Sequence, residues 1–146
     1  MKLSLFFLLF TLAGFGQNDL YKKHTDSLTS LNSQLLLCVK NNPKFEVDCR
    51  KEYFHIIKDM EKELFSDIRQ TMTGEEAKKF QAEENAWTDS SYWYYSTTFK
   101  WFKEKHPTES ILRPSDKSKA DSIKVQNDNA AYVKKRIEVL LEMVKK

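Results

Sequence analysis

The chain has 146 residues, a formal net charge of +3 at pH 7 and three glycines. This length suits one domain, and the small charge, with lysines scattered among acids, excludes the basic surface of a nucleic-acid-binding protein. Hairpin turns and phosphate-binding loops both require glycine. The scarcity of glycine therefore excludes a hairpin-rich β-fold and a phosphate-binding loop, and it favours long helices.

The first sixteen residues have the three parts of a secretory signal peptide. Lys2 supplies a positive charge, residues 3–13 form an apolar run, and Gly14-Phe15-Gly16 places small residues two apart. The run is shorter than the ~20 apolar residues of a transmembrane helix, although a retained membrane anchor is the alternative. We expect cleavage after residue 16, which leaves residues 17–146 as a single domain in the periplasm or outside the cell.

Apolar residues recur at spacings of three and four in the first half of the exported chain, which predicts two amphipathic helices. Asn41-Asn42-Pro43 ends the first helix. Its buried face carries Leu28, Leu31, Leu35 and Cys38. The buried face of the second carries Cys49, Tyr53, Ile56, Ile57, Met60, Leu64, Ile68 and Met72. We expect these two helices to pack as a hairpin.

Two cysteines, Cys38 and Cys49, lie on either side of the turn that contains Pro43. Both are on the predicted buried faces, and an oxidising compartment favours their pairing. We therefore expect a disulfide that links the helical hairpin and stabilises it by roughly 3 kcal/mol on the chain-entropy argument. A redox-active or metal-binding pair is the alternative, although the spacing differs from that of a CxxC motif.

The third helix is predicted to begin at Thr73, which forms a capping box with Glu76, and to end at His106-Pro107. Its seam carries Ala77, Phe80, Glu84, Trp87, Ser91, Tyr94, Thr98 and Trp101. Glu84 is the charged residue of this apolar seam, and a carboxyl in an apolar pocket has a raised pKa and can act as a general acid. The alternatives are a hydrogen-bonded packing residue or a side chain that reaches solvent.

A polar loop is predicted over residues 108–118, and a last helix follows it. The inner face of that helix carries Ala120, Ile123, Ala130, Ile137, Leu140, Leu141 and Val144. Asn127-Asp128-Asn129 predicts a break or an irregular turn in its middle. The three histidines are at positions 24, 55 and 106, and none has a second possible ligand at a metal-binding spacing such as four residues away. This argues against a metal site. We expect an all-α antiparallel bundle of about four helices, monomeric, with one disulfide and no cofactor.

Aromatic residues are concentrated in the third helix, where eight of the sixteen residues from Trp87 to Phe102 are aromatic. At ~100° per residue, seven of them fall within an arc of about 180°, and Trp93 lies opposite. One interpretation is a central core helix packed by the other three, since Trp and Tyr fill small cores. The other is a face that binds a sugar or a protein. The candidate binding residues are Glu84, Trp87, Tyr92, Trp93, Tyr95 and Phe99.

Three segments that span about residues 38 to 141 resemble the LprI-type lysozyme-inhibitor-like domain, a small exported helical module common in bacteria. They are the cysteines at 38 and 49 followed by a helix with Tyr53 and Asp59, the run Phe80-Gln81-Ala82-Glu83-Glu84-Asn85-Ala86-Trp87, and the run Lys135-Arg136-Ile137-Glu138-Val139-Leu140. The chain departs from the family pattern at Glu84, which replaces a glutamine, at Ser91-Tyr92, which replaces an Arg-Asp pair, and near Tyr95, where the family has a cysteine.

The resemblance implies an extracytoplasmic protein, and inhibition of lysozyme is attributed to some members of the family. We therefore expect a non-catalytic binding protein of the cell envelope, with a lysozyme or another envelope protein as its partner. The alternatives are a module that binds glycan or peptidoglycan, and a Glu84-dependent enzyme that cleaves cell walls. Since lysozymes are usually basic, an acidic face would steer an inhibitor toward them. Acidic residues that fit this role are Glu75, Glu76, Glu83 and Asp89.

Overall fold

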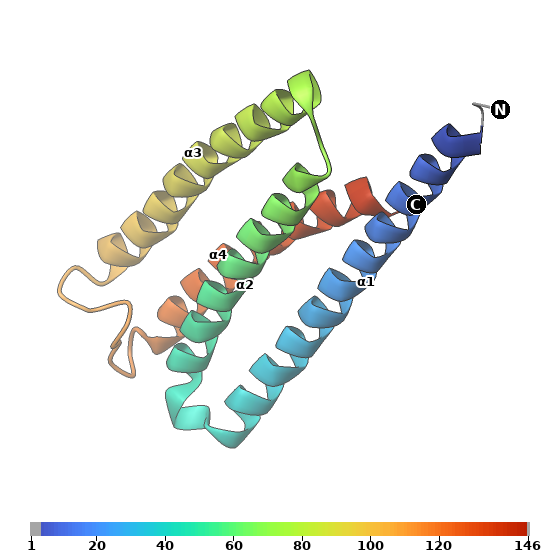
Figure 1. Ribbon diagram of the computed structural model, residues 1–146. Helices are drawn as coiled ribbons and strands as arrows, with labels where there is room; N and C mark the ends of the chain where they lie inside the picture. The colour runs from blue at the N-terminus through green and yellow to red at the C-terminus, as the bar shows by residue number, and fades with distance from the viewer. Residues whose placement is uncertain (1–3, 146) are drawn as a thin grey trace.

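The computed structural model describes the backbone of residues 4–145 and the side chains of residues 18–145. These residues form four α-helices and one short 3-10 helix (Figure 1). The elements are α1 (Ser4–Asn41), η1 (Pro43–Phe45), α2 (Glu46–Gln70), α3 (Gly74–Lys105) and α4 (Lys119–Val144). The bridge between Ser110 and Arg113 is isolated and belongs to no strand. The predicted all-α fold with four helices is confirmed.

The predicted signal peptide falls largely on residues whose side chains lie outside the described part of the chain. Its backbone from Ser4 onward is the first part of α1. Among the described residues, no helix combines the length and the apolar character that crossing a membrane requires. Cleavage and export stay predictions.

Helices α2 and α4 form the centre of the molecule, and α1 and α3 lie on either side of this pair (Figure 1). The pair buries aliphatic side chains completely, among them Ile57, Leu64, Val133, Ile137 and Leu140. Helix α3 contacts α2 and α4, but its described residues make no contact with α1. The interpretation of α3 as a central helix packed by the other three is therefore wrong. Its aromatic residues cover about half of its circumference, which is wider than the contact with α2 and α4, whereas α2 and α4 concentrate their aliphatic residues on facing stripes.

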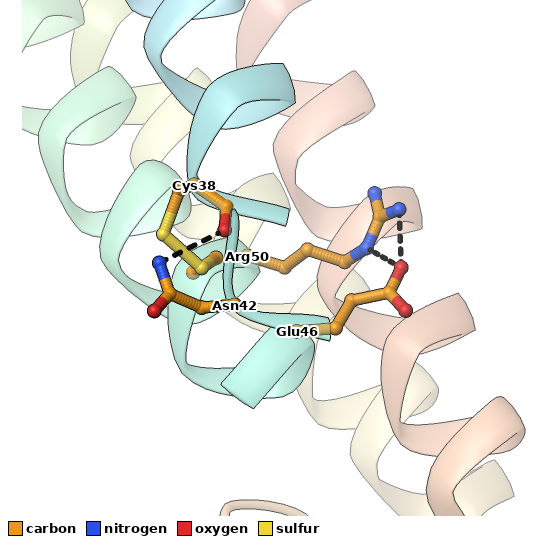
Figure 2. Close-up of a disulfide and its surroundings, with 5 residues drawn as sticks. Cys38, Asn42, Glu46 and Arg50 are labelled. Atoms are coloured by element: carbon orange, nitrogen blue, oxygen red, sulfur yellow. Dashed lines mark hydrogen bonds and ion pairs between the residues drawn. A yellow bond between two sulfur atoms is a disulfide. The ribbon is translucent and has the colours of Figure 1, made fainter. Parts of the chain in front are cut away.

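The turn between α1 and α2 is closed by the predicted disulfide, which is confirmed (Figure 2). Cys38 and Cys49 have their Cα atoms 5.9 Å apart. Pro43 lacks an N–H group, so it does not continue α1 and instead begins η1. The backbone N–H and the side-chain amide of Asn42 both donate to the carbonyl of Cys38, at 2.9 Å and 3.2 Å. The turn is therefore held both covalently and by hydrogen bonds.

The turn between α2 and α3 depends on Gly74, which has φ +59°. Glycine is favoured in this left-handed region because it has no Cβ. Thr73 occupies the cap position of α3, but its side chain makes no capping hydrogen bond. The predicted start of α3 is thus correct, while the predicted capping box with Glu76 is wrong. Gly74 turns the chain sharply at the first residue of the helix, which leaves the Thr73 hydroxyl without its usual N–H partner.

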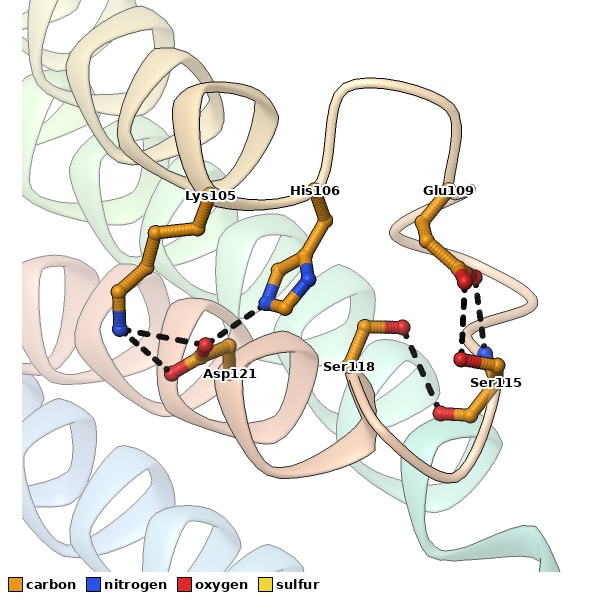
Figure 3. Close-up of polar contacts among 6 residues, drawn as sticks. All are labelled: Lys105, His106, Glu109, Ser115, Ser118 and Asp121. Atoms are coloured by element: carbon orange, nitrogen blue, oxygen red, sulfur yellow. Dashed lines mark hydrogen bonds and ion pairs between the residues drawn. The ribbon is translucent and has the colours of Figure 1, made fainter.

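The loop between α3 and α4 is ordered by polar contacts (Figure 3). The Glu109 carboxylate accepts hydrogen bonds from the hydroxyl and the backbone N–H of Ser115, at 2.9 Å and 3.1 Å. The hydroxyl bond from Ser115 holds the pKa of Glu109 below its usual value. His106 Nε2 lies 2.8 Å from the carboxylate of Asp121, which connects the end of α3 to the start of α4.

Helix α4 is continuous through residues 127–129, so the predicted break is wrong. Asparagine and aspartate side chains usually interrupt a helix by hydrogen-bonding to the backbone nearby. Here the asparagine side chains bond to side chains of other helices instead. Asn127 accepts from Arg50 at 2.7 Å, and Asn129 accepts from Thr98 at 2.9 Å. Ala120, predicted on the inner face, is exposed near the first turn of the helix.

Candidate functional site

Helix α3 presents the six predicted binding residues on two different sides. Tyr92, Trp93 and Phe99 lie on the outside and are 68%, 71% and 49% exposed. The other three lie on the side that faces α2 and α4: Glu84, Trp87 and Tyr95. The six residues therefore do not form one surface. We call the first three the outer aromatic face, and the cavity lined by the second three the inner pocket.

The outer aromatic face is an exposed surface with apolar rings and polar groups. The rings of Tyr92 and Trp93 meet edge to face, with centroids 6.1 Å apart and an interplanar angle of 77°. Asp89 is exposed one turn before Trp93. The rings of Tyr92 and Trp93 each offer a large apolar area and one polar group, whereas Phe99 is wholly apolar. Such a surface suits contact with a protein or with a sugar.

The inner pocket lies between α2 and α3 and has a volume of about 140 Å³. Helix α2 contributes Lys58, Glu61 and Lys62 to its lining, and α3 contributes the three inner residues together with Thr88 and Ser91. The hydroxyl of Ser91 donates to the carbonyl of Thr88 at 2.8 Å, which is a bond within α3. The pocket therefore combines aromatic rings with several polar groups from two helices.

Two buried carboxyl groups, Glu61 and Glu84, meet the guanidinium of Arg136 from α4. Arg136 Nη2 donates to Glu84 Oε2 at 2.8 Å, and Arg136 Nε lies 3.9 Å from Glu61 Oε1. Glu61 is 1% exposed and Glu84 is 7% exposed. One buried positive charge cannot balance two buried negative charges, so one carboxyl is expected to keep its proton.

The carboxyl that keeps its proton is that of Glu61. Burial is the largest cause, and it raises the pKa of Glu61 from 4.5 to about 8, with repulsion from and a hydrogen bond with Glu84 acting in the same direction. The positive charge of Arg136 opposes this shift in pKa without cancelling it. Glu84 has the role of a buried, hydrogen-bonded packing residue, which was one of the alternatives for it.

Polar atoms around the inner pocket lack partners within the protein. Glu61 Oε1 and Arg136 Nε are both buried, lie 3.9 Å apart, and have no hydrogen-bond partner among the described residues. Burial raises the pKa of Tyr95 to about 12, although a hydrogen bond with Ser91 acts to lower it, so the phenol is neutral at physiological pH. An unpaired buried polar atom costs about 1–3 kcal/mol. The pocket is thus able to hydrogen-bond a polar molecule that enters it.

Sequence reasoning missed Glu61 and Arg136 as members of the site, although a signal was present. Glu61 follows Ile57 by four residues and precedes Leu64 by three, which places it on the apolar stripe of α2. Arg136 follows Val133 by three residues on the corresponding stripe of α4. A negative and a positive residue on two apolar stripes predict a buried ion pair between the two helices.

A second polar cluster joins α1 to α2 and has the composition of a metal site. The ligand atoms of His24, Glu63 and Asp67 lie within 4.8 Å of one another. The ammonium of Lys23 lies 2.7 Å from Glu63 and 3.1 Å from Asp67. Burial acts to raise the pKa of Asp67, but hydrogen bonds from His24 and Lys23 outweigh it and leave the pKa lowered. A metal ion would have to displace Lys23, so this cluster is a link between helices.

The predicted acidic face on the first part of α3 is mixed in charge. Its four acidic residues are exposed, as expected, but Lys78 and Lys79 are exposed among them. Lys78 Nζ lies 2.7 Å from Glu75 Oε1. The acid nearest the outer aromatic face is Asp89, for which no ion pair is found among the described residues.

Comparison with known proteins gave no match: no protein family, no curated protein and no solved structure is significantly similar to this chain.

Proposed function

We propose that the protein is an exported, non-catalytic binding protein of the cell envelope, which contacts another macromolecule through the outer aromatic face of α3. The observation that carries the proposal is the exposure of Tyr92 and Trp93 on a rigid helix. A scattered exposed leucine is ordinary, whereas adjoining exposed aromatic rings are typical of contact sites. Trp and Tyr are also enriched among the residues that dominate binding energy.

We further propose that the partner is a lysozyme, on the resemblance of residues 38–141 to the LprI-type domain. The exposed carboxylate of Asp89 beside Trp93 supports this choice, because an acid next to aromatic rings suits a basic protein surface. The disulfide between Cys38 and Cys49 is compatible with the oxidising compartment in which such an encounter would occur.

A turbidity assay tests this proposal with the purified exported protein. Lysozyme clears a suspension of bacterial cells, and the rate of clearing is measured with and without a large molar excess of the protein. We expect the excess to slow the clearing. Clearing at an unchanged rate would remove a lysozyme as the partner, while leaving the outer aromatic face open to another macromolecule.

Binding to peptidoglycan is the second candidate, and the same exposed rings favour it because aromatic rings stack on sugars. Sedimentation with insoluble cell walls in the absence of lysozyme distinguishes it: a glycan-binding protein pellets with the walls, and an inhibitor stays in solution. Wall cleavage that depends on Glu84 has less support, since the Glu84 carboxylate is buried and bound to Arg136. Clearing by the protein alone, lost in Glu84→Gln, would support it.

A further inference from the structure

A groove runs along the hairpin of α1 and α2, two helices that lie side by side and antiparallel (Figure 1). Two adjoining cavities form it, with volumes of about 390 Å³ and 180 Å³, and both are lined by Leu31, Gln34 and Ile56. Along α1 the lining extends from Ser27 to Cys38, which is a rise of roughly 16 Å, or about three turns of helix. The proposed function does not use this groove, because the outer aromatic face belongs to α3.

The floor of the groove is apolar and incompletely covered. Ile56 is 37% exposed, and Leu31 and Leu35 are half-buried, although the sequence places all three on buried helix faces. The hydroxyl of Tyr53, which also lines the groove, donates to Asn32 at 2.6 Å. The floor therefore offers a partner apolar surface to bury, which is the main driving force of association.

The rim of the groove is acidic. Glu52, Asp59 and Glu63 line the two cavities, and no basic residue of the described chain lines them. Glu63 is paired with Lys23 at 2.7 Å, and Asp59 lies 3.7 Å from Lys62, but all four side chains are more than half exposed. Such surface pairs are weak and exchange readily. Glu52 is exposed and has no ion pair within the part of the chain that the structure describes. The rim therefore attracts positive charge.

The apolar floor favours a helical occupant over an extended one. Helices α1 and α2 use their backbone N–H and C=O groups internally, so they offer no free backbone edge to a bound segment. An extended segment would leave its own backbone groups unpaired over apolar side chains, whereas a helix satisfies them itself. Packing of an amphipathic helix into an apolar groove is a recurrent mode of recognition. An anionic membrane surface would be repelled by the rim.

We propose that the groove between α1 and α2 binds a basic amphipathic helix of a partner protein, about three turns long. Its apolar face packs on Ile56 and Leu35, and its Lys or Arg residues lie beside the rim carboxylates, with Glu52 as the unpaired one. The groove and the outer aromatic face belong to different helices, so this proposal stands or falls apart from the proposed function. A contact of this size gives a dissociation constant of roughly 100 μM.

The test is an NMR titration of the ¹⁵N-labelled exported protein with two synthetic peptides of about fourteen residues. Both place leucines at spacings of three and four; one has lysine at the remaining positions, and its match has glutamate. We expect the lysine peptide to shift the backbone amide signals of Leu31 and Ile56. The signal of Leu112, an exposed residue of the loop between α3 and α4, should stay unmoved. The glutamate peptide should shift none of these signals.

Two matched pairs of variants locate the binding. Ile56→Ala removes apolar surface from the floor and should weaken binding about tenfold, whereas Leu36→Ala removes an exposed side chain of α1 outside the groove and should not. Glu52→Lys reverses a rim charge and should also weaken binding about tenfold at low salt. Glu138→Lys makes the same change on the exposed side of α4 and should bind as the wild type does. All four side chains are exposed, so the variants should fold.

The proposal is overturned if the lysine peptide moves neither groove signal, if the glutamate peptide binds equally well, or if Glu52→Lys binds the lysine peptide as the wild type does. Sedimentation of the protein alone tests a second copy of the chain as the occupant. We expect a monomer. A dimer that Ile56→Ala dissociates would show that another copy fills the groove, and it would overturn the choice of partner.

Discussion

The inner and outer sides of α3 are built from the same residue types in opposite surroundings. Phe102 is completely buried, while Phe99, three residues earlier, is half exposed. Likewise Glu84 is buried against Arg136, while its neighbour Glu83 is exposed. The difference shows that position around the helix, rather than residue type, decides whether a side chain stabilises the fold or is free to contact a partner. The inner side should therefore control stability and the outer side should control binding.

The largest expected difference between the sides is in the response to pH. The unfolded chain loses the Glu61 proton near pH 4.5, whereas the folded protein keeps it to about pH 8. The contribution of Glu61 to the free energy of unfolding is therefore greatest below pH 4.5. It decreases as the pH rises to 8, by up to about 1.4 kcal/mol per pH unit. Glu61→Gln should flatten this dependence, because glutamine stays neutral and can donate to Glu84.

Urea denaturation at several pH values between 4 and 9 measures this effect. Glu83→Gln is the matched control, since it removes an exposed carboxyl and should keep the wild-type slope. An equal slope in wild type and Glu61→Gln would show that the buried carboxyl does not retain its proton, and would contradict the account of the inner side.

Two phenylalanines on α3 give the next comparison. Phe102→Ala should lower the free energy of unfolding by about 3–5 kcal/mol, because it leaves a cavity in the core. Phe99→Ala deletes the same atoms from the outer aromatic face and should change stability by less than about 1 kcal/mol. Chemical denaturation of the two variants checks the pair. Similar losses in both would mean that α3 is rotated relative to the structure described.

Arg136 is expected to matter because it is the positive charge that balances Glu84. Arg136→Met keeps much of the packing but leaves a buried carboxylate without a partner, which should cost about 3 kcal/mol. Lys135→Met changes an exposed neighbour on α4 and should be close to neutral. If both variants unfold at the same urea concentration as the wild type, the ion pair does not hold the helices together.

The smallest expected effect on stability comes from the outer aromatic face. A protein with both Tyr92→Ala and Trp93→Ala should unfold within about 0.5 kcal/mol of the wild type, because neither ring loses contacts in the core. Thermal unfolding monitored by circular dichroism checks this. A loss of several kcal/mol would show that the two rings are packed in the folded protein.

Much of the fold could be predicted because its causes are local. The disulfide followed from two cysteines on either side of Pro43, and the helix boundaries followed from Pro43, Gly74 and Pro107. The continuity of α4 could not be predicted in this way. Asn127 and Asn129 favour a break by themselves, and the hydrogen bonds from Arg50 and Thr98 that keep the helix intact come from distant parts of the chain.

The candidate site was predictable only in part, because a helical wheel does not show which neighbour covers which side. The exposure of Trp93 followed from its place opposite the other rings. The inward position of Trp87 and Tyr95 depended on α2 and α4 packing against them. Glu61 and Arg136 belong to other helices. Their contact with Glu84 depends on how the helices pack together, which the amphipathic pattern of one helix does not predict.

The most direct test of the central claim compares lysozyme inhibition by the wild type and by the protein with Tyr92→Ala and Trp93→Ala. Both proteins are added in the same molar excess to a clearing assay, after their stabilities have been matched. The account predicts that the wild type slows clearing and that the double variant does not. Equal slowing by the two proteins would contradict the assignment of binding to the outer aromatic face.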